Sequence, residues 1–407
     1  MATPHFLFGA ATASHQVEGN THNDWTTWEF RMAEEFARRA AAKKWADYIL
    51  NGFPNPLQKE NYISGRACDY YHRFQEDFDI AKSLGHTAHR FSIEWSRIEP
   101  EEGKFDEHEL AHYQEVIAAL RERGLEPFVT LWHYTLPVWL AKKSGIMNKR
   151  FPEYFARYAV RVAQAFSGVS FWITANEPEI VALHSYYKGT RPPGKRGIFS
   201  LWRSMENMIR AHRAAYRSIK EIFPRARIGA AMHLSWFESA GGPMNDLLKY
   251  VMDHFANFYF LERTIAWSDF IGMNHYFHNR IDHGLNKNEN KETTDFGWEI
   301  YPESMYQILK QLKKYRLPIY ITENGLADAR DVWRSSFIAR YLEQVRRAMD
   351  EGVDVRGYFY WSLLDNFEWD SGFWPRFGLV EVDYHTLKRK IRPSALVYKK
   401  IIETWAK

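Results

Sequence analysis

The sequence predicts an α/β protein, a single (β/α)8 TIM barrel that forms one catalytic domain over residues 1–407. Three observations predict this fold. Eight short apolar runs have the composition of buried strands, and helical periodicity fills most of the intervals between them. Polar residues also follow several of these runs directly. In a barrel of parallel strands such residues share one mouth, where the active sites of barrel enzymes lie.

The expected strands are short and rich in β-branched or aromatic residues, which is typical of a buried parallel sheet. The seventh run shows the pattern, because Pro318 precedes its apolar residues and Gly325 follows them. In chain order, strands are expected at residues 6–11, 87–93, 127–131, 171–175, 228–232, 270–274, 319–322 and 357–361.

The intervening segments carry apolar residues at helical spacing, so each segment can bury one face and expose the other. Eight strand runs alternating with such segments favour a barrel over other α/β arrangements. Helices are expected at residues 71–84, 110–123, 155–166, 203–222, 304–315 and 337–349.

A doubly wound open sheet is the alternative fold. To carry a nucleotide it would need a glycine-rich phosphate turn after an early strand, and residues 9–14 (GAATAS) do not form one.

Two segments depart from the regular alternation of strands and helices. Residues 28–62 are expected to be an insertion, with a charged helix to residue 50 and then a loop rich in Pro and Asn. Residues 278–300 are expected to be a polar loop.

The composition allows a sizeable core and excludes several classes of protein. Hydrophobic residues make up 45% of the chain, and the net charge is +4 without a polybasic block, so no nucleic-acid partner is expected. Cys68 is the single cysteine, which excludes a disulfide framework and a multi-cysteine metal site, and no cofactor or metal is expected. Residues 6–12 are too short for a signal peptide, and no run is long enough to span a membrane. A cytoplasmic protein without a membrane partner is therefore expected.

Two expected strands end on a glutamate. Glu323 closes the run that starts at Ile319, and Glu177 closes the run that starts at Phe171. If the strands belong to one barrel, the two carboxylates face one cleft. Glycoside hydrolysis requires such a pair, since one group attacks or holds the anomeric carbon and the other delivers a proton. Further polar residues near strand ends are Gln16, Glu18, Arg90, His133, Asn176, Asn274, Tyr276, Glu368 and Trp369.

The residues at these positions resemble family 1 of the glycoside hydrolases, the β-glucosidase and β-galactosidase family. The resemblance runs nearly from end to end. Asn-Glu-Pro alone recurs in related barrel families, but the first and last segments in the right order make the match specific. The matching segments are FGAATASHQVEG (8–19), RFSIEWSR (90–97), LWHYTLP (131–137), TANEP (174–178), IGMN (271–274), TENG (322–325) and WSLLDNFEW (361–369).

The resemblance implies a retaining β-glycosidase for terminal non-reducing β-D-glucosyl residues, with β-galactosyl and β-fucosyl residues as alternatives. It implies Glu323 as the nucleophile and Glu177 as the acid/base, with carboxyls about 5–5.5 Å apart. Arg90 would hold Glu323 anionic, Tyr276 would hydrogen-bond it, and Asn176 would bind the sugar 2-hydroxyl. A transglycosylase that uses the same site and a non-catalytic sugar-binding barrel stay open as alternatives.

The resemblance also implies a binding site for the sugar that is transferred, the glycone. It places Gln16, His133, Glu368 and Trp369 there, with Trp361 as a stacking wall. Glu368 would accept two hydroxyl protons and repel a phosphate, which favours an unmodified hexose over a 6-phosphorylated sugar. Small-molecule β-glycosides or oligosaccharides are the expected partners. Taken singly, each residue has a structural alternative; His133, for example, could be a satisfied core histidine.

Two departures from the family pattern affect these expectations. Tyr134 stands where many relatives carry Trp, so hydrogen bonding near the sugar 3-hydroxyl is expected to differ. The segments that usually wall the leaving-group side of the cleft are short in this chain. A more open cleft with a weak preference for the leaving group is therefore expected.

Overall fold

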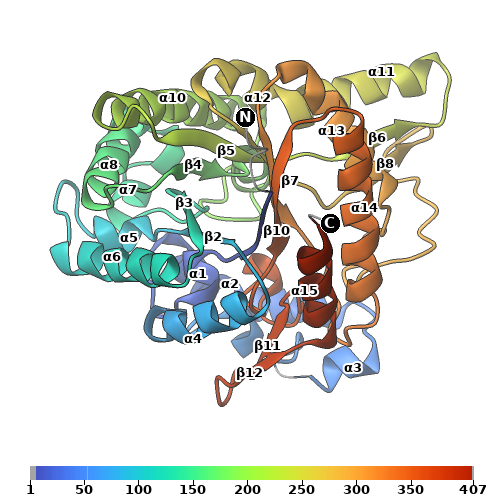
Figure 1. Ribbon diagram of the computed structural model, residues 1–407, viewed down its shortest axis with the longest axis horizontal. Helices are drawn as coiled ribbons and strands as arrows, with labels where there is room; N and C mark the ends of the chain where they lie inside the picture. The colour runs from blue at the N-terminus through green and yellow to red at the C-terminus, as the bar shows by residue number, and fades with distance from the viewer. Residues whose placement is uncertain (1–5, 53, 406–407) are drawn as a thin grey trace.

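The computed structural model describes residues 6–52 and 54–405 and shows a closed barrel of eight parallel strands (Figure 1). The strand order around the barrel is β1-β10-β9-β7-β5-β4-β3-β2, and every neighbouring pair is parallel. The predicted (β/α)8 barrel is confirmed. Its strands are β1 (Leu7–Ala11), β2 (Ala88–Ser92), β3 (Glu126–Thr130), β4 (Phe171–Asn176), β5 (Arg227–His233), β7 (Ile271–Asn274), β9 (Ile319–Asn324) and β10 (Val355–Trp361).

Helices surround the barrel, and their apolar faces build the main core against the outer surface of the strands (Figure 1). The six helices expected from periodicity are present, with shifted ends. They are α4 (Tyr70–Ser83), α6 (Glu107–Glu122), α8 (Phe151–Ala165), α10 (Ile198–Ile222), α13 (Glu303–Leu312) and α14 (Arg334–Asp350). The other α-helices are α1 (Ser14–Val17), α2 (Asp24–Ala41), α3 (Asp47–Leu50), α5 (Trp95–Ile98), α7 (Val138–Lys142), α9 (Pro178–Val181), α11 (Pro243–Met252), α12 (Tyr259–Thr264) and α15 (Pro393–Trp405). Among the described residues, no helix combines the length and the apolar character that crossing a lipid bilayer requires.

The barrel interior has an apolar layer. Phe128 of β3 stacks on Phe171 of β4 with ring centroids 4.1 Å apart, and Tyr320 of β9 joins the same buried cluster. Side chains two positions further along a strand also point into the barrel, and they lie nearer its mouth. These positions carry polar residues, such as Thr130 after Phe128 and Thr322 after Tyr320. The apolar layer therefore forms the floor beneath a polar mouth.

The insertion differs from its expected form. Helix α2 begins at Asp24, four residues before the expected start at residue 28, and ends at Ala41. Asn23 caps it, since its side chain accepts a hydrogen bond from the backbone N–H of Thr26 at 3.0 Å. The expectation of one helix to residue 50 is wrong. The chain leaves the helix after Ala41, and a separate helical turn, α3, follows at Asp47–Leu50.

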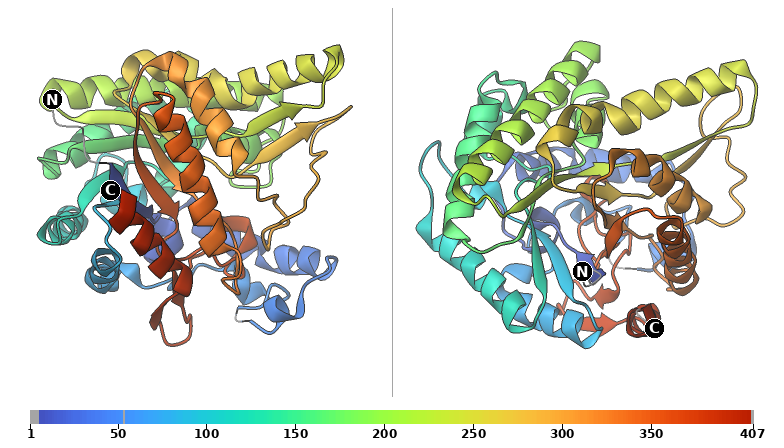
Figure 2. Two further views of the ribbon diagram at one scale, coloured as in Figure 1. Left: turned by 45° about the vertical axis from the view of Figure 1, so that its right-hand side comes forward. Right: turned by 45° about the horizontal axis from the view of Figure 1, so that its top comes forward.

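The expectation of a loop over residues 278–300 is wrong at its start. Residues His278–Ile281 form strand β8, which pairs in parallel with β6 (Trp236–Ser239). Together with α11 they extend from one side of the barrel, as Figures 1 and 2 show. Each strand has four residues and its partner lies far along the chain, so no hairpin turn connects the two strands and marks them as a pair. A second small sheet consists of β11 (Val380–Val382) and β12 (Arg389–Ile391).

Candidate active site

The two strand-end glutamates lie at the same mouth of the barrel. Glu177 follows β4 directly, and Glu323 is the penultimate residue of β9. Both are buried, with 7% and 4% of their surface exposed. Strands β5 and β7 separate β4 from β9 in the barrel order, so the carboxylates face each other across the mouth.

Hydrogen bonds connect one carboxylate to the other through three buried side chains. Arg90 Nη1 donates to Glu323 Oε1 at 2.5 Å, and Arg90 Nη2 donates to Asn176 Oδ1 at 2.6 Å. Asn274 Nδ2 donates to Asn176 Oδ1 and to Glu177 Oε1, both at 3.0 Å. These residues belong to β2, β4, β7 and β9 or follow them directly. The barrel therefore fixes the positions of the two carboxylates relative to each other.

Glu323 accepts hydrogen bonds on both of its carboxylate oxygens. Tyr276 donates its hydroxyl to Oε2 at 2.8 Å, opposite the contact of Arg90 with Oε1. Arg90 is itself held by the carbonyl oxygen of Thr322 at 3.1 Å and by Thr130 Oγ1 at 3.2 Å. Burial raises the pKa of Glu323 to about 7, although the Arg90 charge opposes this shift; the negative charge of the facing glutamate adds to it.

Glu177 has a different set of donors. Tyr134 donates its hydroxyl to Oε2, while Asn274 and His233 lie at Oε1, with His233 Nδ1 at 3.4 Å. Burial tends to raise the pKa of Glu177, but the hydrogen bond and charge of His233, then the bonds from Tyr134 and Asn274, outweigh burial and lower it to about 2. Tyr134 (φ 77°) and Glu177 (φ 44°) both adopt the left-handed backbone region, in which non-glycine residues are strained.

A second polar group lies beside the pair. Gln16 Nε2 donates to the carbonyl oxygen of Phe367 at 2.8 Å and to Glu368 Oε2 at 3.3 Å. Asn176 Nδ2 donates to His133 Nε2 at 3.2 Å. Within residues 6–52 and 54–405, the buried atoms Gln16 Oε1 and His133 Nδ1 have no hydrogen-bond partner. Buried polar atoms are normally paired, so this group can take hydroxyl groups of a ligand.

Aromatic rings wall this polar group. The His133 ring is stacked against Trp361 and against Trp369, each with ring centroids 6.0 Å apart. Trp369 also lies 4.8 Å from the ring of Tyr134, which bonds Glu177. Flat rings beside hydrogen-bonding groups are suited to a sugar, which presents C–H faces and hydroxyl edges.

One strand-end candidate lies outside this constellation. Glu18 accepts hydrogen bonds from Arg97 Nε at 2.9 Å and from the hydroxyl of Tyr113 at 2.7 Å. Its ion pair with Arg97 joins the chain after β1 to α5, and this structural role explains the carboxylate. Glu18 is therefore not placed with the carboxylate pair.

Two residues near the pair were not identified from the sequence. His233 is the last residue of β5, so the strand-end criterion that selected the other residues could have found it. Arg191 lies in a loop, where no periodicity marks it; it pairs with Asp370 at 2.8 Å. Its charge lowers the pKa of Glu368, but burial dominates and, with the charges of Glu323 and Asp370, raises that pKa to about 8.

Known proteins resemble this chain in sequence and in fold. The family model described as "Glycosyl hydrolase family 1" matches residues 2–270 and 245–406. A 1,4-beta-D-glucan glucohydrolase of Thermotoga neapolitana is 33% identical over 98% of this chain and 97% of its own length. The structure of a beta-glycosidase from Pyrococcus horikoshii superposes with a TM-score of 0.86 at 34% identity, covering 99% of this chain and 96% of its own. A beta-glucosidase from Thermotoga maritima in complex with glucoimidazole has a TM-score of 0.85 at 31% identity, with 98% of each chain covered.

Proposed function

The chain belongs to glycosyl hydrolase family 1 and is a β-glucosidase-type O-glycosyl hydrolase, and we propose that it acts on terminal non-reducing β-D-glucosyl residues with retention of configuration. β-Galactosyl and β-fucosyl residues are the alternative glycones. The observation that carries the proposal is the buried pair of Glu177 and Glu323, connected through Asn274, Asn176 and Arg90.

In the first step, Glu323 acts as the nucleophile. One of its carboxylate oxygens bonds to the anomeric carbon while the bond from that carbon to the leaving oxygen breaks. Glu177 gives its proton to that oxygen, so the leaving group departs neutral. Arg90 and Tyr276 hold the attacking carboxylate in place and favour its ionised form.

In the second step, water releases the sugar from Glu323. Glu177 is now ionised and takes a proton from the water, whose oxygen bonds to the anomeric carbon as the bond to Glu323 breaks. The sugar leaves with its original configuration and both glutamates return to their starting states. The donors from Tyr134 and Asn274 stabilise the carboxylate of Glu177 between the two steps.

The mechanism needs one proton on the pair, and that proton must lie on Glu177. The two buried carboxylates interact strongly, so the charges beside them decide which one carries the shared proton. We propose that the proton lies on Glu177 in the active form. The imidazole of His233 is charged only when protonated, whereas the guanidinium of Arg90 is always charged. When His233 is neutral, the remaining cation is at Glu323, which favours the anion there and leaves the proton to Glu177.

The polar group beside the pair supports an unmodified hexose as the glycone. Asn176 can reach the sugar 2-hydroxyl, and Gln16 and His133 have buried atoms available for other hydroxyls. In its ionised form Glu368 can accept two hydroxyl protons, and the negative charge of that form disfavours a phosphate. The rings of Trp361 and Trp369 supply the stacking surface.

The test is the hydrolysis of 4-nitrophenyl β-glucoside, β-galactoside, β-fucoside and 6-phospho-β-glucoside by the wild type and by Glu323→Ala. We expect turnover of the unphosphorylated substrates, loss of turnover in the variant, and recovery with azide to give the inverted α-glycosyl azide. A folded wild type that turns over none of the four would overturn the proposal. Preferred turnover of the phosphorylated substrate would overturn the assignment of Glu368.

A further inference from the structure

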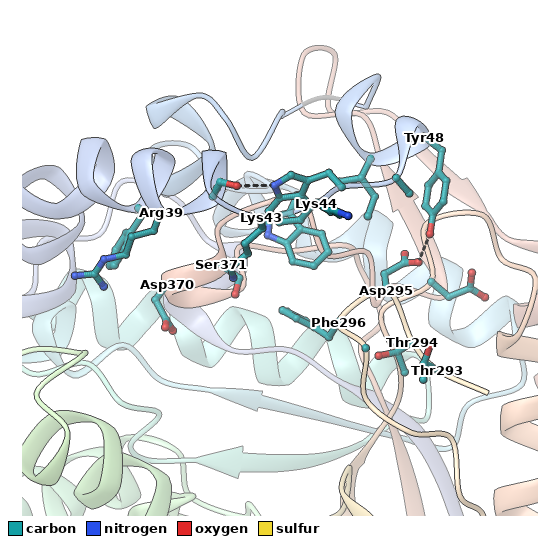
Figure 3. Close-up of a pocket in the computed structure, with 18 of the residues that line it drawn as sticks. Arg39, Lys43, Lys44, Tyr48, Thr293, Thr294, Asp295, Phe296, Asp370 and Ser371 are labelled. Atoms are coloured by element: carbon teal, nitrogen blue, oxygen red, sulfur yellow. Dashed lines mark hydrogen bonds between the residues drawn. The ribbon is translucent and has the colours of Figure 1, made fainter. Parts of the chain in front are cut away.

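A cavity of about 870 Å³ lies between the insertion and residues 291–297 (Figure 3). Its wall contains an aromatic cluster in which Trp374 lies 4.9 Å from Trp45 and 4.8 Å from Phe296. A hydrogen bond of 2.6 Å from the hydroxyl of Tyr48 to Asp295 Oδ1 joins the two sides. The insertion is therefore one wall of a built cavity and does not lie free on the surface.

The cavity adjoins the carboxylate pair from two directions. Asp370 lines it and directly follows Trp369, which belongs to the proposed glycone site. On the other side, Phe296 stacks on Trp298 at 4.5 Å, and Trp298 lies 6.1 Å from Tyr276, the donor to Glu323. If the sugar lies between these groups with its leaving group directed outward, the leaving group enters this cavity.

The acidic residues of the cavity wall are already engaged by partners on the protein. Two of the four form ion pairs with arginines, and the other two accept hydrogen bonds from neutral donors. The partners are Arg191 for Asp370, Arg340 for Glu292, the hydroxyl of Tyr48 for Asp295, and the backbone N–H groups of Trp333 and Arg334 for Asp328.

Only some of the basic residues of the wall form ion pairs with acidic residues. Arg39 and Lys291 form ion pairs with Glu35 and Glu289. Four other cations in the wall form no ion pair among the described residues, namely Lys43, Lys44, Lys188 and Arg330.

These four cations differ in how they are held, and they approach the cavity from different segments. Arg330 packs over the ring of Tyr48 at 4.2 Å, and Lys43 lies 6.0 Å from the ring of Trp45. Lys44 and Lys188 have neither an aromatic nor a hydrogen-bonding contact of their side chains within the described part of the chain. In Figure 3, Lys43 and Lys44 lie across the cavity from Phe296 and Asp370. The cavity thus combines a stacking wall with two lysines, Lys44 and Lys188, whose side chains pair with no group among the described residues.

We propose that this cavity selects β-glycosides whose leaving group carries a carboxylate, with Lys44 and Lys188 as the main contacts of that group. The inference rests on the proposed function and adds the class of leaving group to it. It replaces the expectation of a weak leaving-group preference, because the aromatic wall takes the body of an aryl aglycone while the lysines attract its charge. Lysine suits this task, since its flexible side chain places a compact charge where the ligand needs it.

The test compares 4-carboxyphenyl β-glucoside with 4-carbamoylphenyl β-glucoside, which differ in charge and hardly in size. The measured quantity is the ratio of kcat/KM for the acid to kcat/KM for the amide. We expect Lys44→Gln combined with Lys188→Gln to lower this ratio about fivefold, the effect of exposed charge pairs. Raising the salt from about 0.02 to about 0.5 M should lower the ratio of the wild type as well, because salt screens exposed charges.

The matched control is Lys149→Gln combined with Lys400→Gln. Both lysines are exposed and lie outside the cavity wall, and the double substitution removes the same net charge. This control should keep the wild-type ratio. A ratio that is equal in all three proteins and insensitive to salt would overturn the carboxylate preference while leaving the hydrolase intact. Failure of the proposed function would show differently, as the loss of turnover with both substrates in the wild type.

Discussion

The hydroxyl of Tyr134 donates a hydrogen bond to Glu177 Oε2. The other oxygen of this carboxylate, Oε1, is held by Asn274 at 3.0 Å. Glu177 is therefore bound on both oxygens, as Glu323 is by Arg90 and Tyr276. The two carboxylates have matching tyrosine donors, which allows the two tyrosines to be tested against each other.

Tyr134→Phe should shift the basic limb of the pH profile of kcat/KM to higher pH, by about one unit. The hydroxyl donates to the ionised form of Glu177, so its removal destabilises that form and raises the pKa of the acid/base. Tyr276→Phe is the matched control. It removes the donor from the nucleophile and should move the acidic limb upward instead. If neither limb of the pH profile moves in Tyr134→Phe, the hydroxyl of Tyr134 has no part in protonation of the leaving group.

Glu177→Gln should make the rate depend strongly on the leaving group. Without the acid, we expect substrates with a poor leaving group to lose about 10²–10⁴-fold in kcat/KM. The 2,4-dinitrophenyl β-glucoside needs little protonation and should lose much less in kcat/KM. Added azide should give the β-glycosyl azide, since it replaces the water of the second step. A uniform loss for all leaving groups would contradict the role of Glu177.

The strand ends explain why much of the site could be predicted from the sequence. Burial and the alternation of side chains are local properties, and they place Asn176, Glu177 and Glu323 at one mouth once the fold is a barrel. Glu18 satisfied the same criterion but forms an ion pair with Arg97. The criterion predicts how close a residue lies to the barrel mouth, and it does not predict the direction of the side chain.

The features that could not be predicted depend on contacts between distant segments. Strands β6 and β8 pair across some forty residues of intervening chain, and nothing local in the sequence marks them as partners. Arg191 reaches Asp370 only through the path of its loop. The sequence shows that Tyr134 departs from the family pattern, but the expected effect was a change in hydrogen bonding near the sugar 3-hydroxyl. The left-handed backbone of Tyr134 accompanies a hydroxyl contact with Glu177 instead, and a sequence does not reveal this backbone conformation.

Arg90→Met and Arg90→Lys should separate charge from geometry beside the nucleophile. Methionine removes both, and we expect kcat to fall about 10²–10³-fold, as for the loss of one preorganised donor. It should also move the acidic limb upward, because the Arg90 charge lowers the pKa of Glu323. Lysine keeps a charge but cannot donate to Glu323 and Asn176 as a rigid fork. Its acidic limb should stay near that of the wild type while kcat falls. Equal pH profiles in both variants would assign no electrostatic role to Arg90.

Glu368→Gln should stabilise the protein above neutral pH while it weakens glucoside hydrolysis. Burial raises the pKa of Glu368 from 4.5 to about 8, so an unfolded chain releases this proton at lower pH than the folded one. The stability that the protonated carboxyl contributes is fully present below pH 4.5 and is lost as the pH rises toward 8. Glutamine stays neutral and can still accept the bond from Gln16, so we expect the Tm of the variant to equal that of the wild type near pH 4 and to exceed it by about 2 °C or more at pH 8.

The control for this experiment is Glu101→Gln, which removes the charge of an exposed ion pair with Lys104. Its Tm should follow that of the wild type at every pH, since such pairs contribute little. Glu368→Gln should differ from both in the alkaline range only. If its Tm also followed the wild type from pH 4 to pH 8, the carboxylate would be accommodated in the folded protein without cost. That result would mean that the negative charge of Glu368, which is needed to bind sugar hydroxyls, does not destabilise the folded protein.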